Sequence, residues 1–174
     1  MALLPIIVAP DPRLKLVAKP VAEVDDAVRQ RLSDMLETMY DAPGVGLAAP
    51  QVGDSRRMLV IDVAGQDEEP RPLKIINPEI VWESEQTKSF DEGCLSLPEQ
   101  YAGVERPAEV TVRYLDENGE RQELTADGLL AVAIQHEIDH LDGVLFVDHV
   151  SSLRRNLILR KLTKLKRQKE KAAG

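Results

Sequence analysis

The segment Leu129-Leu-Ala-Val-Ala-Ile-Gln-His-Glu-Ile-Asp-His-Leu141 decides the fold of this chain. Its first half is apolar on nearly every side, which is typical of a helix surrounded by the rest of a protein. We expect this helix to run from about Asp127 to Leu141. Thr125 is placed to cap its start, and Gly143 is placed to end it. The segment therefore predicts a central, buried helix.

Two of the chain's three histidines, His136 and His140, lie on this helix. Side chains four residues apart project from one helical face, so both imidazoles could bind one metal ion. Glu137 follows the first histidine, where its carboxylate could act as a general base on water at the metal. The alternative is two core histidines beside incidental acids. Because burying two imidazoles in an apolar helix is costly unless something binds them, we favour the metal site.

A catalytic metal site needs a third protein ligand and an open coordination position. In one group of zinc peptidases a third histidine follows the second by six residues, but that position here is Phe146. An upstream ligand is therefore expected. The only cysteine, Cys94, lies in the non-periodic segment Glu92-Gly-Cys-Leu-Ser-Leu-Pro98. A loop thiolate with two helical imidazoles would complete the site, and a buried structural cysteine is the alternative.

A third segment, Gly44-Val-Gly-Leu-Ala-Ala-Pro-Gln51, is rich in small residues and has no periodicity. Small residues allow the backbone to approach a ligand closely. Gln51 offers an amide donor that could polarise a substrate carbonyl. A plain glycine loop is the alternative. A phosphate-binding loop is excluded because no Gly-Lys-Ser/Thr follows.

The remaining segments predict an α+β fold with mostly antiparallel sheets around the central helix. Apolar residues at helical spacing predict a first helix from about Asp25 to Asp41. Strands are expected at 58–63, 75–82, 110–115 and 122–125, and Asn118-Gly119 marks a hairpin turn between the last two. A third helix is expected from Ser151 or Ser152 onward. We expect one catalytic domain over residues 1–174, with 151–174 as a basic C-terminal helix.

Composition and charge narrow the class of protein. No apolar run approaches the roughly 20 residues that span a bilayer, and no basic residue precedes the apolar N-terminal stretch, so we expect a cytoplasmic protein without a membrane partner. The formal net charge is −8. Residues 154–171 carry nine basic side chains and one acid, which leaves −16 on the remainder. An acidic body and a basic tail therefore need separate interpretations.

The three segments, in this order and spacing, resemble the peptide deformylase family. The matching blocks are Gly44–Gln51, Glu92–Ser96 and Gln135–Leu141. The likeness also covers Pro10-Asp-Pro-Arg-Leu14 and the first helix, so it spans nearly the whole chain. The resemblance implies metal-dependent hydrolysis of the N-formyl group from the N-terminal formylmethionine of newly synthesised polypeptides, with release of formate. N-formylmethionyl peptides and nascent chains would be its substrates.

The resemblance also implies roles for individual residues. Cys94, His136 and His140 would bind one divalent metal ion, which in this family is usually Fe(II), although Zn, Ni or Co can occupy the site. Glu137 would be the general acid and base, while Gln51 and the backbone N–H of Leu95 would form an oxyanion hole. The expected substrate-binding residues are Val45, Gly46, Glu92, Leu129, Val132 and Ala133. Tyr101 stands where some relatives carry a basic residue, which leaves the outer substrate contacts open.

Two other functions remain as alternatives. One is a metal-dependent endopeptidase with the same His-Glu-x-x-His motif, and the other is a non-catalytic, metal-stabilised binding module. A structural metal would not need Glu137 or Gln51, so their presence favours catalysis. For the basic tail, the resemblance suggests contact with the ribosome near the nascent-chain exit. The alternative is a solvated helix that packs on the body through Leu153, Leu157, Leu162 and Leu165.

Overall fold

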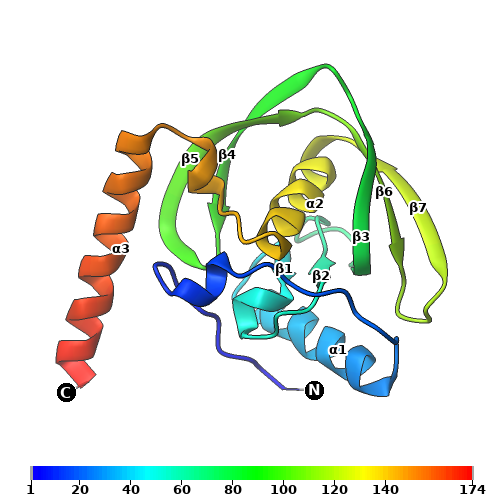
Figure 1. Cartoon of the computed structure of the whole chain (residues 1–174), viewed down its shortest axis with the longest axis horizontal. Coiled ribbons are helices and arrows are strands. Elements are labelled where there is room, and N and C mark those ends of the chain that lie inside the picture. Colours follow the sequence, from blue (N-terminus) through cyan, green and yellow to red (C-terminus); the bar gives the residue numbers. More distant parts are fainter. Residues whose placement is uncertain (1, 174) are drawn as a thin grey trace.

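Helix α2 (Gly128–Leu141) lies inside a curved wall of strands in the computed structural model, which describes residues 2–173 (Figure 1). Ten of its residues are buried. Ala131, Ile134 and Leu141 pack in one apolar cluster with residues of the larger sheet. The predicted central helix is therefore confirmed. Leu129 departs from that prediction because it is 47% exposed, at the end of the helix that borders a cavity.

Two antiparallel sheets surround this helix, as the α+β prediction requires. The larger has the strand order β1-β2-β3-β6-β7. Its strands are β1 (Gly46–Ala48), β2 (Met58–Ile61), β3 (Leu73–Glu83), β6 (Val110–Leu115) and β7 (Arg121–Ala126). The smaller consists of β4 (Thr87–Cys94) and β5 (Leu97–Pro107). Gly119 has a φ of 76° in the turn between β6 and β7, which confirms the predicted hairpin.

The hairpin of β4 and β5 is the largest part of the fold that the sequence did not predict. These strands lack the alternation of apolar and polar residues that marks a strand in a sequence, because charged residues occupy some inward positions. Glu92 on β4 and Arg106 on β5 are both buried. Cys94 is consequently the last residue of a strand and does not lie in a loop. The segment from 44 to 53 is likewise not irregular, because it forms β1 and the 3-10 helix η2 (Ala49–Val52).

The predicted cap of α2 is wrong. Thr125 lies on β7, where its hydroxyl is hydrogen-bonded to that of Thr111 on β6 at 2.8 Å. Asp127 occupies the N-cap position, without a side-chain cap bond. The strand continues to Ala126, so Thr125 is engaged in the sheet before the helix begins. At the other end, Gly143 leaves the helix with a φ of 74°, as expected.

Helix α1 (Asp26–Asp41) packs beside β1 and β2 and forms as predicted. Asp25 caps it by accepting a hydrogen bond from the backbone N–H of Val28 at 2.9 Å. Its apolar face buries Leu32, Met35 and Met39. The short 3-10 helices η1 (Pro12–Lys15) and η3 (Phe146–His149) connect the remaining elements.

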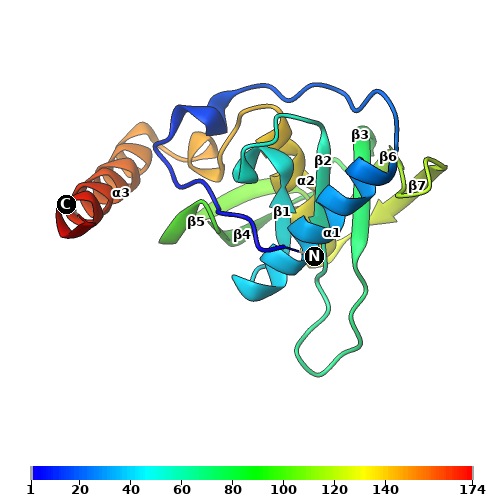
Figure 2. The ribbon, with the colours of Figure 1, turned by 90° about the horizontal axis from the view of Figure 1, so that it is seen from below.

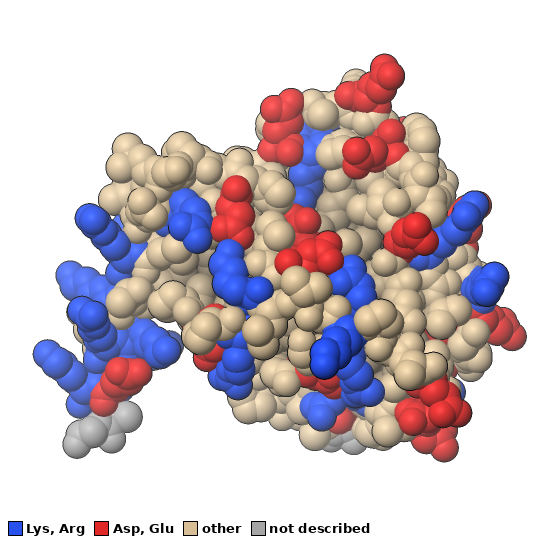
Figure 3. Space-filling model, in the orientation of Figure 1, with Lys and Arg blue, Asp and Glu red and all other residues tan. Residues whose placement is uncertain are grey.

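Helix α3 (Ser152–Ala173) extends away from the body in two views (Figures 1 and 2). Ile158 and Leu162 are buried, but Leu153, Leu157 and Leu165 are 72%, 43% and 40% exposed. Packing through all four leucines is therefore wrong, because only one face of the helix reaches the body. Lysines and arginines crowd along this helix (Figure 3). No helix among residues 2–173 is long and apolar enough to cross a membrane.

Candidate active site

Three side chains from two elements form a potential metal site. Cys94 ends β4, while His136 and His140 lie one turn apart on α2. One donor atom from each lies within 4.8 Å of the others, and Cys94 Sγ is 3.2 Å from His140 Nε2. A thiolate with two imidazoles suits a divalent transition metal. The fold thus brings together the three residues that the sequence suggested as ligands.

Local backbone geometry presents the Cys94 sulfur to hydrogen-bond donors. The strand register shifts between Gly93 and Cys94, where the hairpin turns. The backbone N–H of Ser96 lies 3.4 Å from Sγ, and Gln51 Nε2 lies 3.5 Å from it. These two contacts hold the sulfur in place at the end of β4.

The imidazole of His136 is oriented by a buried ion pair. Its Nδ1 donates to Glu92 Oε1 at 3.0 Å, which leaves Nε2 available for a metal. Arg106 donates to both oxygens of Glu92, from Nε at 2.6 Å and from Nη2 at 2.9 Å. Burial raises the pKa of Glu92, but the hydrogen bonds from His136 and Arg106 lower it by more than burial raises it. The net pKa is therefore below the usual value, and the carboxylate stays ionised.

This network extends to the protein surface. Arg106 Nη1 also donates to Asp139 Oδ2 at 2.8 Å, so Asp139 is a second ion-pair partner of this guanidinium. His149 Nε2 lies 2.8 Å from the same oxygen, so His149 is bonded to the network although its side chain is 38% exposed. Glu92, expected to bind substrate, borders the cavity but directs its carboxylate to Arg106 and His136.

The electrostatics of the two histidines fit a bound cation. Burial lowers the pKa of His140, so this imidazole is neutral, as a metal ligand must be. Burial also lowers the pKa of His136, but the negative charges of Glu137, Cys94 and Glu92 outweigh it and raise that pKa overall. The same anionic surroundings that would stabilise an imidazolium would stabilise a divalent metal ion.

The side chain of Glu137 is almost completely buried beside the potential metal ligands. It is 4% exposed, and its Oε1 has no hydrogen-bond partner among the described residues. Burial raises its pKa to about 7, which suits a group that must take and give a proton near neutral pH. Gly46 on β1 leaves room for this carboxylate: a Cβ there would lie 2.5 Å from Glu137 Oε2.

Gln51 is fixed on η2 with its amide directed toward Cys94. Its Oε1 accepts a hydrogen bond from the backbone N–H of Ala48 at 2.9 Å, and its Nε2 donates to Ser96 Oγ at 3.0 Å. Leu95 follows Cys94 in the turn and packs its side chain against Gly44. Amide donors of Gln51 and of the Cys94–Ser96 turn therefore flank the potential metal site.

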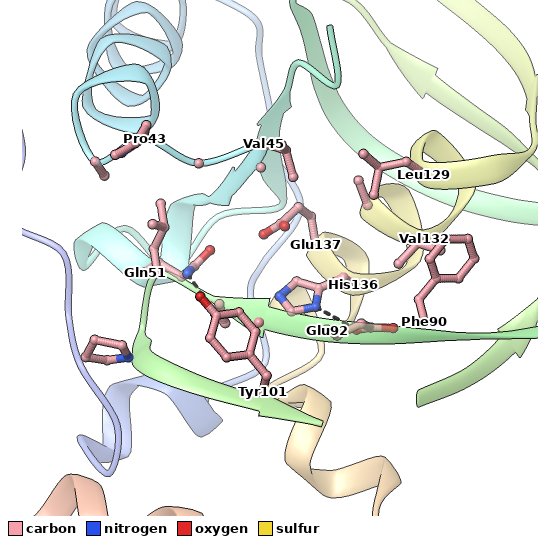
Figure 4. Close-up of a pocket in the computed structure, with 18 of the residues that line it drawn as sticks. Pro43, Val45, Gln51, Phe90, Glu92, Tyr101, Leu129, Val132, His136 and Glu137 are labelled. Carbon is pink, nitrogen blue, oxygen red and sulfur yellow. Dashed lines mark hydrogen bonds and ion pairs between the residues drawn. The ribbon is translucent and has the colours of Figure 1, made fainter. Parts of the chain in front are cut away.

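A cavity of about 590 Å³ opens above these groups (Figure 4). Among its lining residues are all those expected to bind substrate, namely Val45, Gly46, Glu92, Leu129, Val132 and Ala133. Phe90, Pro43 and Pro98 also line it and were missed, because two of them belong to the unpredicted hairpin. Tyr101 faces the cavity in Figure 4, and its ring covers Gly93.

The cavity lies between two strands that are each paired on one side only. Within residues 2–173, β1 pairs with β2 alone and β4 pairs with β5 alone. Both strands contribute residues to the lining, Gly46 from β1 and Glu92 to Cys94 from β4. Unpaired backbone groups of such edges can bind an extended peptide by adding it as a strand.

Comparisons with known proteins agree on one family. The family model described as polypeptide deformylase matches residues 3–156. The peptide deformylase of Mesorhizobium japonicum is 55% identical over all of this chain and 98% of its own length. That of Agrobacterium fabrum is 54% identical over 97% of this chain and 99% of its own.

Solved structures give the same result. The crystal structure of a peptide deformylase from Legionella pneumophila superposes with a TM-score of 0.89 at 49% identity, covering 97% of this chain and 98% of that one. The peptide deformylase from Ehrlichia chaffeensis in complex with actinonin gives a TM-score of 0.92 at 41% identity, covering 96% and 99%. The similarity therefore extends through the cavity and all three motifs.

Proposed function

This chain belongs to the peptide deformylase family and hydrolyses the N-formyl group of nascent polypeptides; we propose that Cys94, His136 and His140 hold its metal. One observation supports this assignment most strongly: three functional groups from different parts of the chain lie beside one cavity. The potential metal ligands, the buried carboxylate of Glu137 and the amide of Gln51 all come together there. An endopeptidase and a non-catalytic module are not favoured by the family assignment.

We infer one divalent metal ion per chain, and on the strength of the family resemblance we propose Fe(II) in the native protein. Zn, Ni or Co would also suit a thiolate with two imidazoles. Such an ion, when bound, supplies Lewis-acid chemistry that polarises the formyl carbonyl and makes water a stronger nucleophile. Glu92 would contribute indirectly, because it orients the imidazole of His136.

The reaction adds water to the formyl carbon and breaks the bond between that carbon and the methionine nitrogen. Glu137 would take the proton from the attacking water and give it to the leaving amine, which its pKa of about 7 permits. Gln51 Nε2 and the backbone N–H of Leu95 would donate to the oxygen on which negative charge develops. Formate and a free amino terminus result.

Substrate binding would use the apolar wall and the two free strand edges. Val45, Leu129 and Val132 would surround the methionine side chain. The peptide backbone would then extend between β1 and β4 and make main-chain hydrogen bonds to their unpaired groups. Tyr101, on β5, lines the cavity on the side of the β4–β5 hairpin and would contact the residues that follow the methionine.

The variant Glu137→Ala tests the assignment of the acid and base. It should keep its metal, because Glu137 is not in the ligand cluster, yet release almost no formate from formyl-Met-Ala. Glu69→Ala, in an exposed loop, is the matched control and should behave as wild type. Full activity in metal-loaded Glu137→Ala would refute the role, and cleavage of unformylated casein by the wild type would support an endopeptidase instead.

We propose that the basic helix α3 contacts the ribosome, which would place the reaction in the cytoplasm beside the emerging chain. Arg160, Lys164 and Arg167 line one groove along this helix. Replacing these three by glutamine would remove charge without touching Ile158 and Leu162, which anchor the helix. Co-sedimentation with ribosomes should weaken and become less sensitive to salt. Unchanged co-sedimentation would count against this contact.

A further inference from the structure

Asp62 directly follows β2, and its buried carboxylate accepts hydrogen bonds from the end of α1 and from both ends of the loop between β2 and β3. The residue is 5% exposed. Its Oδ1 accepts a hydrogen bond from the backbone N–H of Ala64 at 2.9 Å, and its Oδ2 accepts one from the backbone N–H of Arg71 at 3.0 Å. These two bonds close the base of the long loop between β2 and β3 (Figure 2). The hydroxyl of Tyr40, near the end of α1, donates to Oδ2 at 2.5 Å.

The same residue is bonded to the wall of the cavity. The backbone N–H of Asp62 donates to the carbonyl of Val45 at 2.9 Å, next to the paired residues Gly46 and Ile61. At the other end of the wall, Tyr40 precedes Ala42 and Pro43, which line the cavity. The segment from 42 to 45 is therefore attached at one end to α1 and at the other to β2, and the Tyr40–Asp62 bond joins these two anchors.

The hydroxyl of Tyr40 is not needed to satisfy the buried carboxylate. Asp62 keeps both backbone hydrogen bonds without it. Tyr40 is 43% exposed, but partial desolvation of its hydroxyl and the neighbouring Asp62 raise its pKa to about 12, so the hydroxyl remains a donor at neutral pH. Its specific effect is to tie the end of α1 to the strand behind the cavity wall. In Figure 4, Pro43 and Val45 stand on the side of the cavity opposite Glu92.

We propose that Tyr40 is a positioning residue for substrate binding: acting through Asp62, it sets the place of the wall from residue 42 to 45, which ends before Gly46 and its contact with Glu137, and against which formylmethionine binds. The inference rests on the proposed function of the cavity. It concerns a side chain that touches neither the potential metal ligands nor Glu137 in any hydrogen bond of residues 2–173. The wall would contact substrate equally before and during reaction, so its displacement should weaken binding more than it slows chemistry.

The variant Tyr40→Phe removes only the hydroxyl. Steady-state formate release from formyl-Met-Ala should show a KM raised roughly fivefold, the scale of one hydrogen bond, while kcat stays within about twofold. Metal content should be unchanged. Tyr114→Phe is the matched control, because Tyr114 is half-buried on β6 and does not line the cavity. Hydrogen exchange of the Asp62 amide should be faster in Tyr40→Phe only.

The outcomes separate this inference from the proposed function. A wild-type KM in Tyr40→Phe, with faster exchange at Asp62, would show that the bond is only structural and would overturn the inference. A fall in kcat accompanied by metal loss would also overturn it, because Tyr40 would then act on the metal centre. A wild-type protein that releases no formate would overturn the proposed function and this inference with it.

Discussion

Replacing Gly46 by alanine should damage catalysis while leaving the metal in place. The added Cβ would lie 2.5 Å from Oε2 of Glu137, 2.9 Å from Cδ and 3.0 Å from Cγ. Carbon and oxygen atoms normally stay about 3.4 Å or more apart, so the carboxylate must move by roughly 1 Å. Gly46 lies on β1 without a positive φ, so the alanine backbone itself is acceptable there.

The size of the effect follows from how Glu137 is held. The side chain is 4% exposed on the buried helix α2, so it has little space into which to retreat. A misplacement of about 1 Å in a reacting group can cost on the order of 100-fold in rate. We therefore expect kcat for formate release to fall by roughly 10- to 100-fold, with metal content and ligand geometry unchanged.

The matched control is Gly103→Ala on β5, where an added Cβ would meet no atom within 4 Å. Both substitutions remove similar conformational entropy from the unfolded chain, so differences between them report the folded protein. Formate release, metal content and the urea midpoint should be measured for both variants. Equal kcat values in Gly46→Ala and Gly103→Ala would refute the close contact between Gly46 and Glu137.

Three further predictions concern the metal and the ion pairs. Glu92→Gln should release its metal to a chelator roughly tenfold faster, because His136 loses its charged acceptor; an unchanged rate would contradict this role. Wild type should unfold at a higher temperature with metal than without it, whereas Cys94→Ala should show no such difference by calorimetry. Burial raises the pKa of Asp148, but hydrogen bonds from Lys15 and Arg155 outweigh this effect and lower the pKa below its unfolded value of 3.8. The charged carboxylate therefore stabilises the fold fully above pH 3.8. This stabilisation is lost as the pH falls through the lowered pKa. Asp148→Asn should thus lower the free energy of unfolding by about 1 kcal/mol at pH 7, and urea titrations should show the gap to wild type closing below pH 3.8.

Motif spacing predicted the side chains that the fold brings together as a potential metal site, in spite of an error in the fold. His136 and His140 are four residues apart on a helix, so their common face follows from helical geometry alone. Cys94 was placed in a loop, but it ends a strand whose partner the sequence did not reveal. The error did not change which side chains meet, because a strand end and a loop can place a cysteine beside the two histidines equally well.

Other parts of the site lacked a local signal. Arg106 gave no sign that it would be buried, since charged residues are mostly exposed and its two partners are distant in sequence. Tyr40 and Asp62 are 22 residues apart, and neither is part of a recognisable motif. Such contacts depend on where whole elements pack, which local patterns do not specify.

The sequence by itself determined the three motifs, the central helix, the hairpin between β6 and β7, and the division into an acidic body and a basic tail. These features depend on spacing and composition along a continuous stretch of chain. Only the tertiary structure decided that Glu92 orients His136, that Gly46 contacts Glu137, and that Leu153, Leu157 and Leu165 on α3 stay exposed. Each of these is a contact, or a missing contact, between elements far apart in sequence, and it is set by how helices and sheets pack around one core.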